Sequence, residues 1–292
     1  MNFREITIDD REEINGYFEK YGGKTAENSF TNMFIWGGPC GSRFAVSDGF
    51  LVMKSDYENV QKICGFPIGN GDLKSLIYKL HDYFVEKFGR FELINVPDES
   101  RKIIEEIMPG HFEFEHTRNE DDYIYEVSKL ISLSGKKLHS KRNNFNYFNA
   151  NYKYVYEKIN KENLEECRAY LLNHIKENTA DKVKEPESIN VLFDNYERLC
   201  VKGGLLRTDG KIIAASVGEK YNGGAIIHVE KAERSIRGAY TTINKLLLEN
   251  EFSDCVYVNR EEDMGIEGMR QAKMSYNPVF LLEKYRGRWI HD

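Results

Sequence analysis

The segment VYVNREEDMGIEGMRQAKMSYNP, residues 256–278, has the most informative pattern in this sequence. It opens with a short apolar stretch, Val256 to Val258, that predicts a β-strand, and four consecutive charged residues follow at 260–263. A helix is predicted next, near 266–273. In open α/β sheets, ligands bind just beyond the carboxyl ends of strands. We therefore expect a functional site directly after this strand.

Length and composition limit the class of protein. A chain of 292 residues favours two domains, and 41% hydrophobic with 30% charged residues is typical of a globular protein with a sizeable core. The 41 basic and 47 acidic residues give a net charge of -6, which excludes a general nucleic-acid binder. Any site for a polyanion must therefore be a local basic patch.

The cysteines and the hydropathy pattern predict a cellular compartment. The five cysteines are odd in number and lack metal-ligand spacing, so we predict reduced thiols and no metal site. No N-terminal stretch resembles a signal peptide, and no run approaches the roughly 20 apolar residues of a membrane helix. We predict a soluble, cytoplasmic protein without an integral membrane segment. Peripheral membrane contact and the oligomeric state stay open.

The two halves of the chain repeat one order of elements. Each reads as a hairpin, a strand, a glycine-containing turn, a long helix, a strand, a short helix and a strand. Hairpin signals occur at Asp48-Gly49 and Asp209-Gly210, and long helices are predicted at 72–88 and 239–249. We predict a tandem duplication of one α/β unit. The N-terminal domain would span 1–128 and the C-terminal domain 129–292, joined near 126–133.

This order of elements is similar to the acyltransferase fold of the GCN5-related N-acetyltransferases. The resemblance implies an α/β (α+β) protein with two such domains, each a mixed sheet flanked by helices. In that fold, antiparallel strands lead through a phosphate-binding turn into a helix and then a parallel strand. The helix N-terminus can hold phosphate because its first amides are unpaired and its dipole is positive there.

Two blocks of residues carry a more specific resemblance. They are Asn259-Arg260-Glu261-Glu262-Asp263 with Gly265, Gly268, Arg270, Lys273, Tyr276 and Pro278, and Leu133 to Lys137 with Lys141 to Asn143. Over nearly the whole chain, the sequence resembles the soluble C-terminal domain family of phosphatidylglycerol lysyltransferases. The resemblance implies a tandem acyltransferase fold, distantly similar to the Fem-type ligases that use aminoacyl-tRNA. It leaves the substrate of stand-alone members open.

The charged cluster after Val258 is the first candidate site. Acyl transfer needs a base near the attacking group and positive charge near phosphate or a developing oxyanion. Glu261, Glu262 and Asp263 are candidate bases, and Arg260 supplies positive charge. Four residues complete the predicted substrate-binding part of this site: Asn259, Arg270, Lys273 and Tyr276. The alternative is a structural ion-pair network.

The segment 133–156 is the second candidate site, because it is basic and aromatic and contains no Asp or Glu. Heptad spacing of Ile131, Leu138 and Phe145 predicts one helix with a buried face. Lys137, Lys141 and Arg142 would then bind the phosphates of tRNA or another anionic donor. A solvated helix face beside a domain linker is the alternative.

The turn 234–239 before the second long helix is the third candidate. Arg234 and Arg237 could hold phosphate, but the acetyltransferase loop has Gly where Arg237 stands, which weakens the case for coenzyme A. The corresponding turn of the first half, Gly69-Asn70-Gly71, has no basic residue nearby, so we expect no donor site there. His228 is a candidate base, and a structural histidine is its alternative.

These observations predict an aminoacyl- or acyltransferase whose C-terminal domain carries the active cleft. The donor would be aminoacyl-tRNA or another phosphate-bearing molecule, and no cofactor is required beyond this co-substrate. Two alternatives stay open. One is an acetyltransferase that takes an acyl-CoA such as acetyl-CoA, and the other is a non-catalytic module that binds an anion or a partner.

Overall fold

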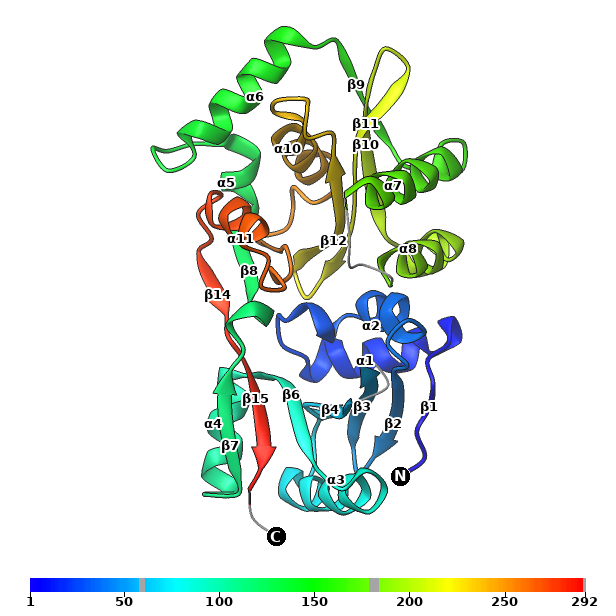
Figure 1. Cartoon of the computed structure of the whole chain (residues 1–292), viewed down its shortest axis with the longest axis vertical. Helices are drawn as coiled ribbons and strands as arrows, with labels where there is room; N and C mark the ends of the chain where they lie inside the picture. The colour runs from blue at the N-terminus through cyan, green and yellow to red at the C-terminus, as the bar shows by residue number, and fades with distance from the viewer. Residues whose placement is uncertain (58–60, 179–183, 291–292) are drawn as a thin grey trace. The chain divides into compact units, whose positions relative to one another are not determined.

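The computed structural model describes residues 1–57, 61–178 and 184–290, and the chain divides into two compact units. Unit 1 comprises Met1–Asp121 and Leu282–Asp292, and unit 2 comprises Asp122–Leu281. Each unit has one mixed β-sheet with helices packed on it (Figure 1). The predicted fold class is confirmed.

Unit 1 is built on an eight-stranded sheet in the order β1-β2-β3-β4-β6-β15-β7, with β5 paired to β3. The strands are β1 (Arg4–Glu5), β2 (Arg43–Ser47), β3 (Phe50–Tyr57), β4 (Gln61–Gly65), β5 (Ile68–Gly69), β6 (Glu92–Pro97), β7 (Phe112–His116) and β15 (Lys284–Trp289). The helices are α1 (Arg11–Tyr21), α2 (Phe30–Gly37), α3 (Leu73–Phe88) and α4 (Asp98–Ile107). Three single 3-10 turns lie at Ile8–Asp10, Ala26–Asn28 and Arg118–Glu120.

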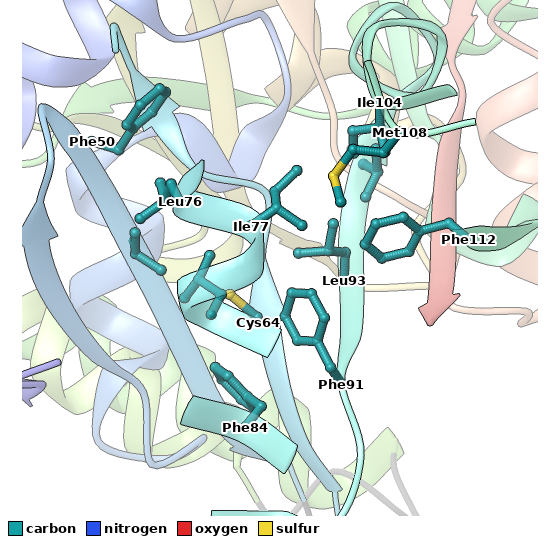
Figure 2. Close-up of a cluster of buried hydrophobic side chains, with 13 residues drawn as sticks. Phe50, Cys64, Leu76, Ile77, Phe84, Phe91, Leu93, Ile104, Met108 and Phe112 are labelled. Carbon is teal, nitrogen blue, oxygen red and sulfur yellow. The ribbon is translucent and has the colours of Figure 1, made fainter. Parts of the chain in front are cut away.

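Helix α3 supplies much of the core of unit 1. Its buried side chains Leu76, Ile77, Leu80 and Phe84 recur at helical spacing, as the sequence predicts. Figure 2 shows Leu76, Ile77 and Phe84 among side chains from the sheet, including Leu93 of β6. Burying each such side chain contributes about 1.5–3 kcal/mol. The apolar segment that forms α2 is also core, with three of its large side chains buried: Phe30, Met33 and Ile35.

Unit 2 is built on a seven-stranded sheet in the order β14-β8-β13-β12-β11-β10-β9. The strands are β8 (Asp122–Glu126), β9 (Tyr154–Lys158), β10 (Lys202–Thr208), β11 (Lys211–Tyr221), β12 (Gly224–Ala232), β13 (Tyr257–Asn259) and β14 (Phe280–Leu282). The helices are α5 (Val127–Ser132), α6 (His139–Asn151), α7 (Leu164–Asn178), α8 (Glu185–Asp194), α9 (Tyr196–Leu199), α10 (Ala239–Glu251) and α11 (Glu267–Met274). In Figure 1, α10 lies on the opposite side of β12 from α7 and α8. Within the described ranges, no helix has the length and apolar character needed to cross a membrane.

The two sheets share the predicted order of elements. In each, an antiparallel meander is followed by a helix and a strand parallel to the last meander strand. These pairs are β4 with β6 after α3, and β12 with β13 after α10. The parallel pair of unit 2 lies beside the charged cluster, so this topology positions the candidate site.

The last strands of the two halves differ from the prediction. The sequence predicts one strand at the end of the second half, but the structure has two there, β14 in unit 2 and β15 in unit 1. β15 pairs with β6 and β7 of the first sheet, whereas β8, which follows β7 in sequence, pairs with β13 of the second. The expected division at 128/129 therefore differs from the observed units. Strand partners are non-local, so the alternation of apolar residues does not reveal them.

The single helix expected across 131–145 is also wrong. α5 ends at Ser132, and Leu133 and Gly135 have positive φ angles of 51° and 91°. Such backbone is incompatible with a continuing right-handed helix. α6 begins only at His139, so the three apolar residues at heptad spacing lie on separate segments.

Candidate active site

The parallel pair β12–β13 separates soon after it begins. Its register pairs Ala225 with Val258 and Ile226 with Asn259, while β12 continues to Ala232. A β-bulge follows at once in β12, because His228 is the extra residue opposite the Val217–Gly218 step of β11. Bulges bend a strand and are common beside active sites. The residues after β13 therefore meet a part of β12 that β13 does not pair.

Arg260 and Glu230 occupy this opening. Arg260 Nη2 donates to Glu230 Oε1 at 2.6 Å, and Asn244 Nδ2 of α10 donates to Glu230 Oε2 at 2.9 Å. The guanidinium lies 4.7 Å from the ring centroid of Tyr276 and 5.6 Å from that of Tyr125. Burial disfavours the charge of Arg260, but Glu230 together with Tyr125 and Tyr276 outweighs burial and raises the pKa of Arg260. We name these residues, together with Lys141, the Arg260 cluster.

Two polar atoms of the Arg260 cluster lack a hydrogen-bond partner within the described part of the chain. They are Arg260 Nη1 and Asn244 Oδ1, and both are buried. The amide of Asn244 is oriented by Glu230, because a carboxylate accepts only from the NH₂ group. A buried donor and a buried acceptor left unpaired are costly, and such groups in native proteins call for an explanation. A bound substrate that pairs with these two atoms is one such explanation.

Lys141 reaches the Arg260 cluster from α6. Its Nζ lies 3.9 Å from the centroid of the Tyr276 ring, whose hydroxyl is 3.3 Å from Thr241 Oγ1. Burial and the positive charge of Arg260 lower the pKa of Lys141 to about 8, and Glu230 opposes them. The site thus combines cations and aromatic rings around one carboxylate.

The loop after β13 is held by Asp263 and Lys273. Asp263 is fully buried and accepts hydrogen bonds from Arg270 Nε and Nη2, both at 2.9 Å, from the Tyr123 hydroxyl at 2.6 Å and from Gly265 N at 2.8 Å. Burial would raise the pKa of Asp263, but these donors lower it to about 2. Lys273 Nζ donates to the carbonyl oxygens of residues 260, 261 and 262 at 2.5, 3.1 and 2.6 Å.

His228 and Asn259 also hold this loop in place through hydrogen bonds. Both ring nitrogens of His228 contact carboxylates: Nε2 lies 3.1 Å from Glu219 and Nδ1 3.0 Å from Glu261. Burial alone would lower the pKa of His228, but the two carboxylates raise it to about 9. Asn259 accepts from the backbone N–H of Glu261 at 2.7 Å and donates to Asp122 at 2.8 Å.

The turn before α10 packs against α6. Gly238 has a φ of 92°, and a Cβ there would lie 2.3 Å from the carbonyl oxygen of Asn144. Arg237 Nε donates to Asn144 Oδ1 at 3.2 Å, and its guanidinium lies 4.5 Å from the Tyr147 ring centroid. α6 therefore lies directly against the N-terminal end of α10.

The predicted site residues thus fall into three groups, all within unit 2. Arg260, Lys141 and Tyr276 meet in the Arg260 cluster. The loop and its supports contain Asn259, Glu261, Asp263, Arg270, Lys273 and His228. Lys137, Arg234 and Arg237 are exposed around α6 and the turn, and Arg142 Nη1 donates at 2.6 Å to the carbonyl oxygen of Leu133. Glu230 of β12 and Asn244 of α10 were not among the predicted site residues, because both elements carry other polar residues and no local pattern distinguishes these two.

The family described as phosphatidylglycerol lysyltransferase, C-terminal, matches residues 18–287. The chain belongs to this family. A protein of unknown function from Bacteroides thetaiotaomicron VPI-5482 is 36% identical, with a TM-score of 0.94 over 99% of this chain and 100% of that one.

Two more distant structures share the fold of this phosphatidylglycerol lysyltransferase C-terminal family member. L-PGS from Bacillus licheniformis is 16% identical, with a TM-score of 0.66 over 96% of this chain and 92% of that one. A tandem GNAT protein from the clavulanic acid biosynthesis pathway is 9% identical, with a TM-score of 0.54 over 100% of this chain and 99% of that one. The similarity extends over both units, so a tandem GNAT-like fold is the correct description.

Proposed function

We propose that this chain transfers an aminoacyl or related acyl group, and that the transfer takes place at the Arg260 cluster. The observation that carries the proposal is the unpaired Arg260 Nη1, buried where β12 and β13 separate. Acyl transfer builds negative charge on the carbonyl oxygen, and a preorganised buried donor stabilises that charge. Membership of a family named for lysyl transfer supports the same class of reaction.

An aminoacyl ester carried by tRNA fits the surroundings better than an acyl-CoA. Lys137, Arg234 and Arg237 are exposed cations near α6 and the turn before α10, where they can contact a phosphate backbone. By contrast, the turn that would hold a coenzyme A pyrophosphate packs on α6 through Gly238. The tandem GNAT-like fold keeps the acyl-CoA reading as the second candidate.

We assign positioning roles to most of the residues predicted as catalytic. Asp263 accepts four hydrogen bonds and stays ionised, so it is a poor proton acceptor. His228 keeps its proton between two carboxylates, so it is no base at neutral pH. In this proposal, Glu261, His228 and Asp263 hold the loop that places Arg260.

The proposal is tested by single-turnover assays with tRNA charged with a mixture of labelled amino acids. We expect protein-dependent loss of aminoacyl ester, at least about 100-fold slower in Arg260→Lys, since removing one oxyanion donor costs about that much. Arg198→Lys, an exposed change outside the Arg260 cluster, is the matched control. Calorimetric titration with acetyl-CoA runs in parallel.

The outcomes separate the three functions. Loss of ester in the unchanged protein but not in Arg260→Lys supports aminoacyl transfer. Micromolar acetyl-CoA binding with turnover, and no reaction of charged tRNA, would replace it with the acyl-CoA reading. Folded protein that reacts with neither donor would favour a binding module.

A further inference from the structure

Lys141 is a partly buried amine beside the place where we propose that acyl transfer occurs. Its Nζ and the guanidinium of Arg260 both lie against the ring of Tyr276. Within the described residues, no carboxylate oxygen approaches Lys141 Nζ within the 4.0 Å of an ion pair. Lysines are almost never fully buried without a partner, and Lys141 is partly buried with an aromatic ring in place of an acid.

The carboxylates of the Arg260 cluster and of the loop after β13 already have other partners. Glu230 binds Arg260 and Asn244 through its two oxygens. Glu261 contacts His228, and Asp263 binds Arg270. None of these three is placed to pair with Lys141 or to take a proton from a substrate without losing a structural contact.

We propose that the Lys141 amine is the general base of the reaction and takes the proton from the attacking group of the acceptor. This inference rests on the proposed function. The acceptor's amine or hydroxyl attacks the carbonyl carbon, so a new C–N or C–O bond forms and the ester C–O bond breaks. Lys141 Nζ receives the proton of the attacking group and returns it to the leaving hydroxyl oxygen, so the protein ends unchanged.

The surroundings favour this role because they ease deprotonation of Lys141. Burial and the charge of Arg260 bring its pKa to about 8, near the pH at which a general base is most effective. The Tyr276 ring favours the ammonium form, which keeps the amine in place once it has been protonated. Arg142, the next residue in sequence, binds backbone carbonyls and cannot replace it.

A direct test measures the titration of the amine in the whole protein. The protein is labelled with trace acetic anhydride between pH 6 and 11, and acetylation at each lysine is quantified by peptide mass spectrometry. Lys136 and Lys137, exposed and in the same segment, are the internal references. We expect the midpoint for Lys141 near pH 8, whereas a lysine in a model peptide titrates near about 10.4. A midpoint for Lys141 equal to that of Lys137 would overturn the proposal; slower labelling by itself would not shift a midpoint.

The second arm measures transfer from charged tRNA by Lys141→Arg, with Lys136→Arg as the matched control. We expect kcat about 100-fold lower in Lys141→Arg with KM changed less than about threefold, and loss of the pH limb near 8. Unchanged kcat and pH profile would overturn the base assignment and leave the proposed function intact. If the unchanged protein transfers nothing at any pH, the proposed function fails and the base assignment fails with it.

Discussion

Arg260 Nη2 and Glu230 Oε1 lie 2.6 Å apart, although the residues are 30 positions apart in sequence. Both side chains are almost completely buried, with 11% and 9% of their surface exposed. Breaking a buried ion pair by removing one partner typically costs about 3–5 kcal/mol, because the other charge stays buried and uncompensated. We therefore predict that Arg260→Met lowers the free energy of unfolding by about that amount.

The matched variant for Arg260→Met is the double change Glu230→Gln with Arg260→Met. Glutamine keeps an oxygen that can accept from Asn244 but carries no charge, so we expect the double variant to regain a large part of the lost stability. Urea denaturation of the two single variants and of the double variant measures this coupling. Strictly additive effects would contradict a pairwise ionic contact.

His228 makes stability depend on pH on the alkaline side. Its folded pKa of about 9 lies above the ordinary histidine pKa of 6.5, so its contribution is fully present below pH 6.5 and is lost as the pH rises through about 9. We predict that the free energy of unfolding falls by roughly a few kcal/mol across this window. The variant His228→Gln should lack this dependence, as followed by denaturant unfolding at several pH values. His139→Gln, an exposed change, is the control and should keep the slope.

Local patterns in the sequence predicted most of the helices and strands. α3 and α10 carry apolar residues at helical spacing, and the turns at Asp48-Gly49 and Asp209-Gly210 end strands as predicted. The placement of β8 and β15 was not predictable in this way. Each of these strands pairs with strands that are distant in the sequence. The residue pattern of the strand itself does not identify the sheet that it joins.

The position of the charged loop after β13 was predicted, but the contacts of its residues were not. The charged run after Val258 marks the end of β13, so the location of the loop follows from the sequence. Glu230 and Asn244 were not predicted, because β12 and α10 each carry other polar residues and only the contact between these two distinguishes them. The sequence also did not predict the partners of Asp263 and His228, because these contacts join residues that are distant in the sequence. Which of these residues touch substrate stays a prediction.

Gly238 allows α6 to approach the turn before α10. An alanine there would adopt a φ of 92° and place its Cβ 2.3 Å from Asn144 O. Gly210 also has a positive φ, 76°, but nothing lies within 4 Å of its Cβ position. Comparing alanine variants at these two glycines separates the cost of backbone strain, about 1–3 kcal/mol, from the cost of steric overlap.

We predict that Gly238→Ala loses at least about 2 kcal/mol more stability than Gly210→Ala, since α6 must also move. Thermal and urea unfolding of the two variants measure the difference. Equal losses would mean that α6 is not packed tightly on the turn. In that case the main objection to a pyrophosphate at this helix end would weaken.

The exposed cations around α6 lead to a prediction about tRNA binding, which rests on the proposed function. Each phosphate contact that is removed lowers the slope of log K against log salt by about 1. Lys137→Ala and Arg234→Ala should each weaken binding of uncharged tRNA and reduce that slope, because both side chains are exposed. Lys211→Ala, at the β10–β11 hairpin, is the exposed control and should change neither.

Arg142→Ala should behave differently from these variants, although the sequence groups it with Lys137. Its guanidinium donates to the carbonyl oxygens of Leu133 and Gly135, at 2.6 and 3.3 Å. Hydrogen bonds to a charged group contribute about 1.5–3 kcal/mol, so we expect lower stability with an unchanged salt slope. Filter binding at several salt concentrations, beside urea unfolding, distinguishes the two effects. A reduced slope for Arg142→Ala at full stability would place its side chain on the phosphate backbone instead of the loop.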